Sequence, residues 1–318
     1  FIGQQLTNVL EELERVTKGK LSPEEKTDLK LNVVGKIPDV LLDNTDRNRT
    51  SSFAFTGNKF EFRAVGSIAN CANPMTVLNT IVAKQLKDFK AEVDALIEEK
   101  DLKKDEAIFN ILREYIKSSR NILFEGNGYS EAWEKEAKKR GLSNNKTTPE
   151  ALKAKISKKA IELFEEMNVM SKVETESRYE IEIEEYTLRI QIESRVLGDI
   201  AGNHIVPTAV RYQNMLIENV KGLKEIFGKD FEEHAKEQIK LIKGISEHIE
   251  AIHFKVEEMI NARKKANNLK DAVKKAEMYC SEVKPFFEEI RYHCDKLELM
   301  VDDEIWPLTK YRELLFTR

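Results

Sequence analysis

The sequence predicts an α+β fold that is predominantly α, in which a small antiparallel β structure near the front is followed by a large helical region. Glycine (13) and proline (7) are scarce among the 318 residues, and 34% of the residues are charged. This composition is typical of long solvated helices rather than of a strand-rich fold with many turns. One hairpin signal stands near the front, and apolar residues at three- and four-residue spacing fill most of the remainder.

Two short aromatic runs predict the β structure. Phe53-Ala54-Phe55 and Phe60-Glu61-Phe62-Arg63 flank Thr56-Gly57-Asn58, and aromatic strand formers on both sides of a Gly-Asn turn are typical of a hairpin. Upstream, Ser22-Pro23-Glu24-Glu25 predicts the start of a short helix, because Ser suits the N-cap and Pro the first helical position. Lys36-Ile37-Pro38-Asp39 is expected to end that helix.

The helical region begins at Asn73-Pro74, where an N-cap residue precedes a proline. Apolar residues then recur at helical spacing over 77–97, again over 108–116, and beyond Thr148-Pro149 for almost the whole remaining chain. Residues 120–149 are richer in glycine and asparagine and are predicted to be looser.

The run 179–183 alternates between apolar and acidic residues in a way that is also compatible with a strand. Its continuation to Ile200 keeps a helical period for longer than a strand lasts, so we predict a helix that Pro207 interrupts. Another long helix is predicted over 231–260, and shorter helices broken at Pro285 follow.

Composition and charge exclude several functional classes. Lys and Arg number 52 against 56 Asp and Glu, which gives a net charge of −4 and disfavours nucleic-acid binding through bulk positive charge. No stretch approaches the roughly 18 apolar residues of a membrane span. No signal peptide is expected at the front, and the three widely spaced cysteines fit a reducing cytoplasm better than a disulfide framework. Because the sequence opens on Phe1, we expect it to be a piece of a longer chain.

Charged residues gather in one place on the predicted strands. Lys59, Glu61 and Arg63 alternate with Phe60 and Phe62, so the charged side chains share one face. If the phenylalanines pack into a core, Glu61 could hold a divalent metal, while Arg63 and the nearby Arg49 grip phosphate or carboxylate. The alternative interpretation is a solvated strand face with one ion pair, and spacing alone leaves both open.

Other candidate residues give weaker signals. His248 and His253 are five residues apart and point to different helix faces, and His204, His234 and His293 are isolated in the sequence. Gly126-Asn127-Gly128 contains two glycines of a phosphate-loop pattern and is more typical of a turn. The apolar stripes of the later helices are more often the inside of a bundle than a partner surface.

The order of motifs along the chain resembles that of the glutamine synthetases. Three segments are similar to the catalytic motifs of that family, in the same order: Asn48-Arg49-Thr50, Phe60-Glu61-Phe62-Arg63 and Ala72-Asn73-Pro74. Five further segments resemble the type III branch in their residue order, namely Gly35–Asp39, Asn44–Thr50, Phe53–Lys59, Ser194–Asp199 and Asp302–Leu308. The resemblance covers essentially the whole chain.

The resemblance implies a fold and a division of the chain. Residues 1–119 would be the C-terminal part of the catalytic domain, with strands at about 47–65 and long helices after them. The β structure would then be a remnant of that domain. Residues 120–318 would be the helical C-terminal region typical of type III.

The resemblance also implies ATP-dependent ligation of ammonia to L-glutamate through γ-glutamyl phosphate, with Mg²⁺ or Mn²⁺. Glu61 is similar to the family's metal-binding strand glutamate, and Arg63 matches the arginine that contacts glutamate and the transferring phosphoryl group. Arg49 matches a catalytic arginine that contacts phosphate, and Lys59 stands where a basic residue meets the nucleotide. The family's other implied properties are a cytoplasmic location and a ring-shaped homo-oligomer, a dodecamer in the full-length protein.

Two departures qualify the resemblance. Ala54 replaces a further arginine of shorter glutamine synthetases. The family's remaining metal ligands, its ammonium-site acids and its flap glutamate all lie upstream of Phe1, so the chain by itself is expected to be inactive. Two other readings remain open, namely a related carboxylate–amine ligase and a non-enzymatic helical scaffold.

Overall fold

The computed structural model describes residues 4–15, 53–55, 59–62, 70–124 and 127–316. The described residues are predominantly helical, as predicted, and divide into two compact units. One unit is drawn from residues 1–145 and 162–170, and the other from 146–161 and 171–318. The helix predicted to start at Ser22 and to end near Pro38 lies outside the described residues.

The first unit contains the only β structure among the described residues. Strands β1 (Phe53–Phe55) and β2 (Phe60–Phe62) pair in antiparallel fashion, with Phe53 opposite Phe62, Ala54 opposite Glu61 and Phe55 opposite Phe60. The predicted hairpin strands are therefore confirmed. The helices of this unit are α1 (Gln4–Arg15), α3 (Ala72–Lys100), α4 (Lys104–Ser118), the 3-10 turn η3 (Arg120–Ile122) and α5 (Glu131–Lys139).

Helices α3 and α4 form an antiparallel pair. Phe89 and Tyr115 face each other across it with ring centroids 5.9 Å apart, and the Tyr115 hydroxyl donates to Glu92 Oε1 at 2.9 Å. The start of α3 differs from the prediction, because Asn73 lies inside the first turn. The amide of Ala72 donates instead to Asn70 Oδ1 at 2.8 Å.

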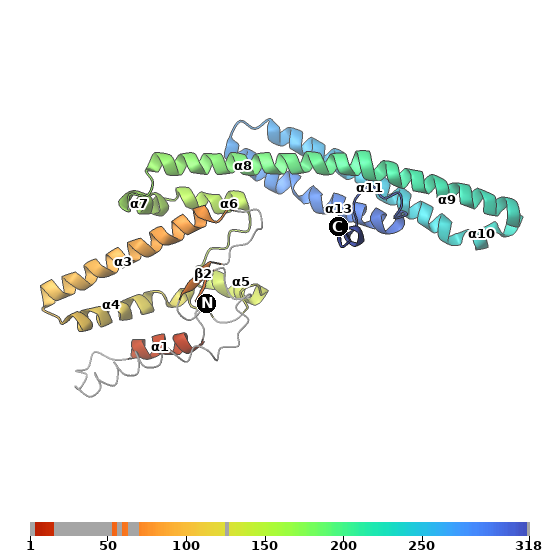
Figure 1. Cartoon of the computed structure of the whole chain (residues 1–318). Helices are drawn as coiled ribbons and strands as arrows, with labels where there is room; N and C mark the ends of the chain where they lie inside the picture. Colours follow the sequence, from red (N-terminus) through yellow and green to blue (C-terminus); the bar gives the residue numbers. More distant parts are fainter. Residues whose placement is uncertain (1–3, 16–52, 56–58, 63–69, 125–126, 317–318) are drawn as a thin grey trace. The chain divides into compact units, whose positions relative to one another are not determined.

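The second unit is built around an almost unbroken helical rod. Figure 1 shows α8 (Lys172–Asp199), the π-helix η5 (Ile200–Ile205) and α9 (Val206–Phe227) following one line. Gly228 ends the rod with φ +59, a left-handed value that suits glycine. The helix predicted over 179–200 is thus confirmed over the strand alternative.

The remaining elements of this unit cover the rod or connect to it. Helix α11 (Lys236–Asn267) returns antiparallel to α9, and α13 (Pro285–Met300) packs along α11 (Figure 1). The shorter elements are α6 (Thr148–Leu152), η4 (Lys153–Ile156), η6 (Gly228–Asp230), α10 (Phe231–His234), α12 (Ala272–Met278), η7 (Tyr279–Val283) and α14 (Tyr311–Leu314). Helix α7 (Lys158–Glu166) is divided between the two units.

The core of the second unit lies where α8, α9, α11 and α13 meet. It is formed by side chains that are almost completely buried, among them Ile205, Ile245, Ile252, Met259, Tyr279, Ile290 and Leu297. The Tyr279 hydroxyl donates to Asn267 Oδ1 at 2.8 Å, which ties η7 to the end of α11. The apolar stripes of the later helices therefore lie largely inside a bundle, as predicted.

Pro207 and Pro285, which lie in the long helices α9 and α13, each follow a π-helical turn. The amide of Val206, just before Pro207, donates to the carbonyl of Ala201, five residues earlier. The amide of Lys284, just before Pro285, donates to Tyr279 O in the same way at 2.9 Å. Proline lacks an N–H group and its ring collides with the carbonyl four residues before it, and a π turn moves that carbonyl aside. The interruptions predicted at Pro207 and Pro285 thus take the form of π turns within a continuing helical path.

Candidate functional site

The predicted site residues fall only partly within the structure. Lys59 and Glu61 lie on and beside β2, whereas Arg49 and Arg63 lie outside the described residues. The Lys59 Nζ is 3.9 Å from Glu61 Oε1, and the two side chains are 66% and 39% exposed. They therefore share one face of the strand, as period-two alternation predicts.

The aromatic side chains behind that face are only partly buried. Phe60 is 50% exposed and Phe62 is half-buried, so neither side chain is fully buried. A hairpin with three residues in each strand has little surface to bury by itself. Among the described residues, burial of the aromatic side chains therefore does not account for the position of Glu61.

Glu61 could supply one ligand of a divalent-metal site, but it does not form such a site by itself. The described residues contain no group of three or more His, Cys, Asp or Glu side chains that could hold a metal ion. Mg²⁺ is bound in proteins through one or two carboxylates together with waters and phosphate oxygens. A single partly exposed carboxylate on a strand is compatible with that chemistry only if further ligands come from elsewhere.

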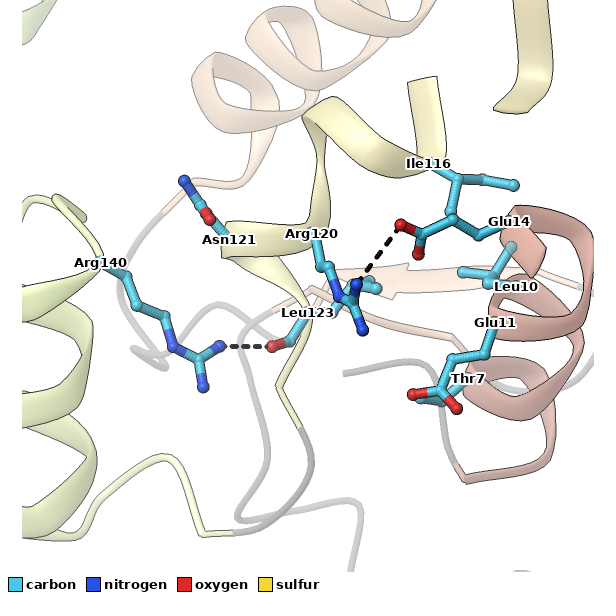
Figure 2. Close-up of a pocket in the computed structure, with 9 residues that line it drawn as sticks. All are labelled: Thr7, Leu10, Glu11, Glu14, Ile116, Arg120, Asn121, Leu123 and Arg140. Carbon is cyan, nitrogen blue, oxygen red and sulfur yellow. Dashed lines mark hydrogen bonds and ion pairs between the residues drawn. The ribbon is translucent and has the colours of Figure 1, made fainter. Parts of the chain in front are cut away.

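A cleft of about 370 Å³ lies in the first unit, where α1 faces η3. Figure 2 shows its walls, where Arg120 Nη1 pairs with Glu14 Oε1 at 3.3 Å and Arg140 Nη1 donates to the carbonyl of Leu123 at 2.7 Å. Arg140 also pairs with Glu136 at 2.9 Å. Because both guanidinium groups already have protein partners, we interpret the cleft as part of the packing of α1. Lys59 and Glu61 do not line it.

Two histidines that are far apart in the sequence form a pair in the second unit. His248 on α11 and His293 on α13 approach with their Nδ1 atoms 2.9 Å apart and their ring centroids 5.2 Å apart. The centroid separation exceeds the Nδ1–Nδ1 distance by about two ring radii, so the two nitrogens point almost directly at each other. One proton between them makes a hydrogen bond, whereas protons on both nitrogens would collide. His293, expected to be isolated, thus has a partner that only the packing of α11 on α13 provides.

The pair makes the stability of the bundle sensitive to acid. Burial lowers the pKa of His248 below its ordinary 6.5, with smaller contributions from His293 and Lys296 and an opposing one from Glu247. Below pH 6.5 the unfolded chain takes up a proton that folded His248 resists, so the free energy of unfolding is expected to fall with falling pH. The free energy of unfolding stops falling once the pH lies below the pKa of His248 in the folded protein.

Urea unfolding of the wild type and of His248→Gln, above and below pH 6.5, tests this expectation. The variant should lose part of the acid sensitivity, whereas exposed His253 on the same helix should give a His253→Gln control that keeps it. Equal pH profiles for the wild type and His248→Gln would contradict the assignment.

The comparisons with known proteins cover the whole chain. It is 52% identical over its full length to a glutamine synthetase of Bacteroides fragilis, and 36% identical to the type-3 glutamine synthetase of Dictyostelium discoideum. A glutamine synthetase of Butyrivibrio fibrisolvens is 31% identical over 86% of the chain. Residues 107–224 match the model of the glutamine synthetase C-terminal domain. The chain belongs to the glutamine synthetase family.

The resemblance noted from the motifs is therefore confirmed at the level of the family. The chain spans less than half of the relatives it matches, namely 44%, 43% and 38% of their lengths. The glutamine synthetase C-terminal domain begins within α4 and ends within α9, so it includes residues of both compact units. The division predicted at residues 119 and 120 stays a prediction. Arg49, Lys59, Glu61 and Arg63 all precede the matched domain, and their roles are proposals. Among the described residues, no helix is both long and apolar enough to cross a membrane.

Proposed function

We propose that the full-length protein to which this chain belongs is a cytoplasmic glutamate–ammonia ligase. In this reaction the γ-carboxylate of L-glutamate takes the terminal phosphoryl group of ATP. Ammonia then attacks the acyl carbon and gives up one proton as inorganic phosphate leaves, so that the products are glutamine, ADP and hydrogen phosphate. The similarity of the whole chain to a glutamine synthetase of Bacteroides fragilis, at 52% identity, is the observation that carries this proposal.

The residue types at the proposed site suit this chemistry. A phosphoryl group that moves between two anionic groups needs positive charge on its oxygens. Glu61 would hold a Mg²⁺ or Mn²⁺ ion that neutralises part of the phosphate charge. Arg63 would bind glutamate and the transferring phosphoryl group, and Arg49 and Lys59 would contact the nucleotide phosphates, because guanidinium and ammonium groups donate to phosphate oxygens. The described geometry of Lys59 and Glu61 on one strand face supports this arrangement.

The chain would supply one wall of the site, and the rest of the protein the other ligands. This explains why the described residues contain no set of three metal-binding side chains. The full-length protein would assemble into a ring-shaped homo-oligomer, with a dodecamer as the expected form.

Activity measurements on two lengths of the protein test the proposal. The full-length protein is expected to form glutamine from ATP, glutamate and ammonia in the presence of Mg²⁺ or Mn²⁺, and the isolated chain to form none. Glutamine formation by the isolated chain would show that the chain holds a complete site. A full-length protein that ligates another amine or acid in preference would contradict the proposed substrates.

A further inference from the structure

Helix α8 carries a second apolar stripe on the side away from its core. The stripe consists of four residues at seven- and four-residue spacing, each between 50% and 59% exposed: Ile181, Leu188, Ile192 and Val196. Residues two apart on an α-helix are rotated by about 200° and so lie on opposite sides. Ile181 stands two residues from the buried Tyr179 and Ile183, and Ile192 stands two residues from the buried Ile190. The outer stripe therefore lies opposite the core face.

A helix that is apolar on two opposite sides is normally covered on both. We propose that the outer stripe packs against the same stripe of a second copy of this chain, with the two α8 helices antiparallel. The stripe from Ile181 to Val196 is about 22 Å long, which is enough for four apolar side chains from each copy to interdigitate. The proposal names a surface for the self-association proposed above and does not depend on the ligase activity.

The charges at the two ends of the stripe favour a second copy of α8 as the partner and favour the antiparallel direction of that helix. Arg178 precedes the stripe by three residues and Asp199 follows it by three, and both are exposed. With a twofold axis between Leu188 and Arg189, Ile181 would face Val196 of the partner subunit, and Arg178 would face Asp199 of the partner subunit. A parallel pair would instead place like charges together at both ends, which is unfavourable.

One acidic residue also lies on this face and is compatible with the contact. Glu185 is held by Arg189 of its own helix, with the Oε1 and Nη2 atoms 3.4 Å apart. Its charge is therefore paired before any contact forms. The stripe is small compared with a standard protein interface of about 800 Å² per partner, so we expect weak association, with a dissociation constant of about micromolar order.

Sedimentation equilibrium of this chain tests the contact. The wild type should show a concentration-dependent monomer–dimer equilibrium, and Leu188→Glu should raise the dissociation constant at least about tenfold, since it brings two carboxylates together at the twofold axis. Ile226, which is 75% exposed on α9 and lies off the stripe, gives the matched control Ile226→Glu, expected to associate like the wild type. Circular dichroism checks that each variant keeps its helices. A monomeric wild type, or equal association of wild type and Leu188→Glu, would overturn the proposal.

Charge reversal and crosslinking test the direction of the helices. Arg178→Glu should weaken the dimer, and adding Asp199→Arg should restore it. In a Cys71→Ser background, a short bismaleimide should link two copies that carry both Ile181→Cys and Val196→Cys, and should not link copies that carry Ile181→Cys alone. Linkage through the single cysteine would show a parallel pair and overturn the arrangement. The isolated chain could stay monomeric while the full-length protein still forms its ring. This result would overturn the α8 contact and leave the proposed ring intact.

Discussion

Replacing Glu61 by alanine in the full-length protein is expected to lower turnover at least about a hundredfold, and to raise the concentration of Mg²⁺ or Mn²⁺ that activity requires. The proposed role of Glu61 is to hold the ion beside the transferring phosphoryl group. Its loss would remove one negatively charged ligand from the ion that also binds the phosphate oxygens of ATP. Initial rates of glutamine formation over a range of metal concentrations measure both effects.

A second variant, Arg63→Ala, separates metal binding from substrate binding. Arg63→Ala is expected mainly to raise the KM for glutamate, because Arg63 is proposed to bind that substrate. Glu218 lies on α9 and pairs with Lys221 at 2.6 Å, so Glu218→Ala should keep wild-type kinetics and serve as the control. Unchanged kinetics in both Glu61→Ala and Arg63→Ala would discredit the site assignment.

Replacing Ile252 by alanine is expected to lower the free energy of unfolding of the helical unit by about 3 kcal/mol. Ile252 lies in the middle of α11 with none of its surface exposed, in the core cluster shared by α8, α9, α11 and α13. The substitution removes three carbon atoms and leaves a cavity that packed helices fill only partly.

Urea unfolding followed by circular dichroism measures this loss. Ile252→Val should cost only about 1 kcal/mol, because it removes a single carbon atom. Ile226→Ala, at a position that is 75% exposed, should change the free energy by less than about 0.5 kcal/mol. A cost for Ile252→Ala that is no larger than the cost for Ile226→Ala would mean that the helices do not pack as described.

The helices were predictable because their apolar residues are periodic over many turns. The segment from Tyr179 to Ile183 is instructive, since its strand-like alternation has a physical cause. Tyr179 and Ile183 are buried in a smaller core cluster with Ala276 of α12, and Ile181 belongs to the outer stripe. A helix with two apolar sides places apolar residues two apart, as a strand does, and only the length of the pattern separates the two structures.

The errors arise where tertiary contacts decide the outcome. Asn73 has the right residue type for an N-cap, but Asn70 performs a related role three residues earlier. The approach of His293 to His248 depends on the alignment of two helices that are far apart in sequence. The charged face of β2 was predicted to be rigid on the condition that Phe60 and Phe62 pack into a core, and Phe60 is 50% exposed.

The candidate site was predictable only through family resemblance. Spacing placed Lys59 and Glu61 on one strand face, which the structure confirms. Spacing could not distinguish a metal ligand from a solvated ion pair, because both arrangements need the same alternation. The proposed roles of Arg49 and Arg63 stay predictions.

The two π turns also limit how the length of this chain can change. Each residue of a helix advances the side-chain direction by about 100°. Deleting one residue between Ile200 and Ile205 would therefore swing the following helix around its axis and expose Val206 and Ala209, which are now buried. Pro207 would at the same time regain the collision that the wider turn avoids. Single-residue deletions at these two points should thus be among the least tolerated in the helical unit.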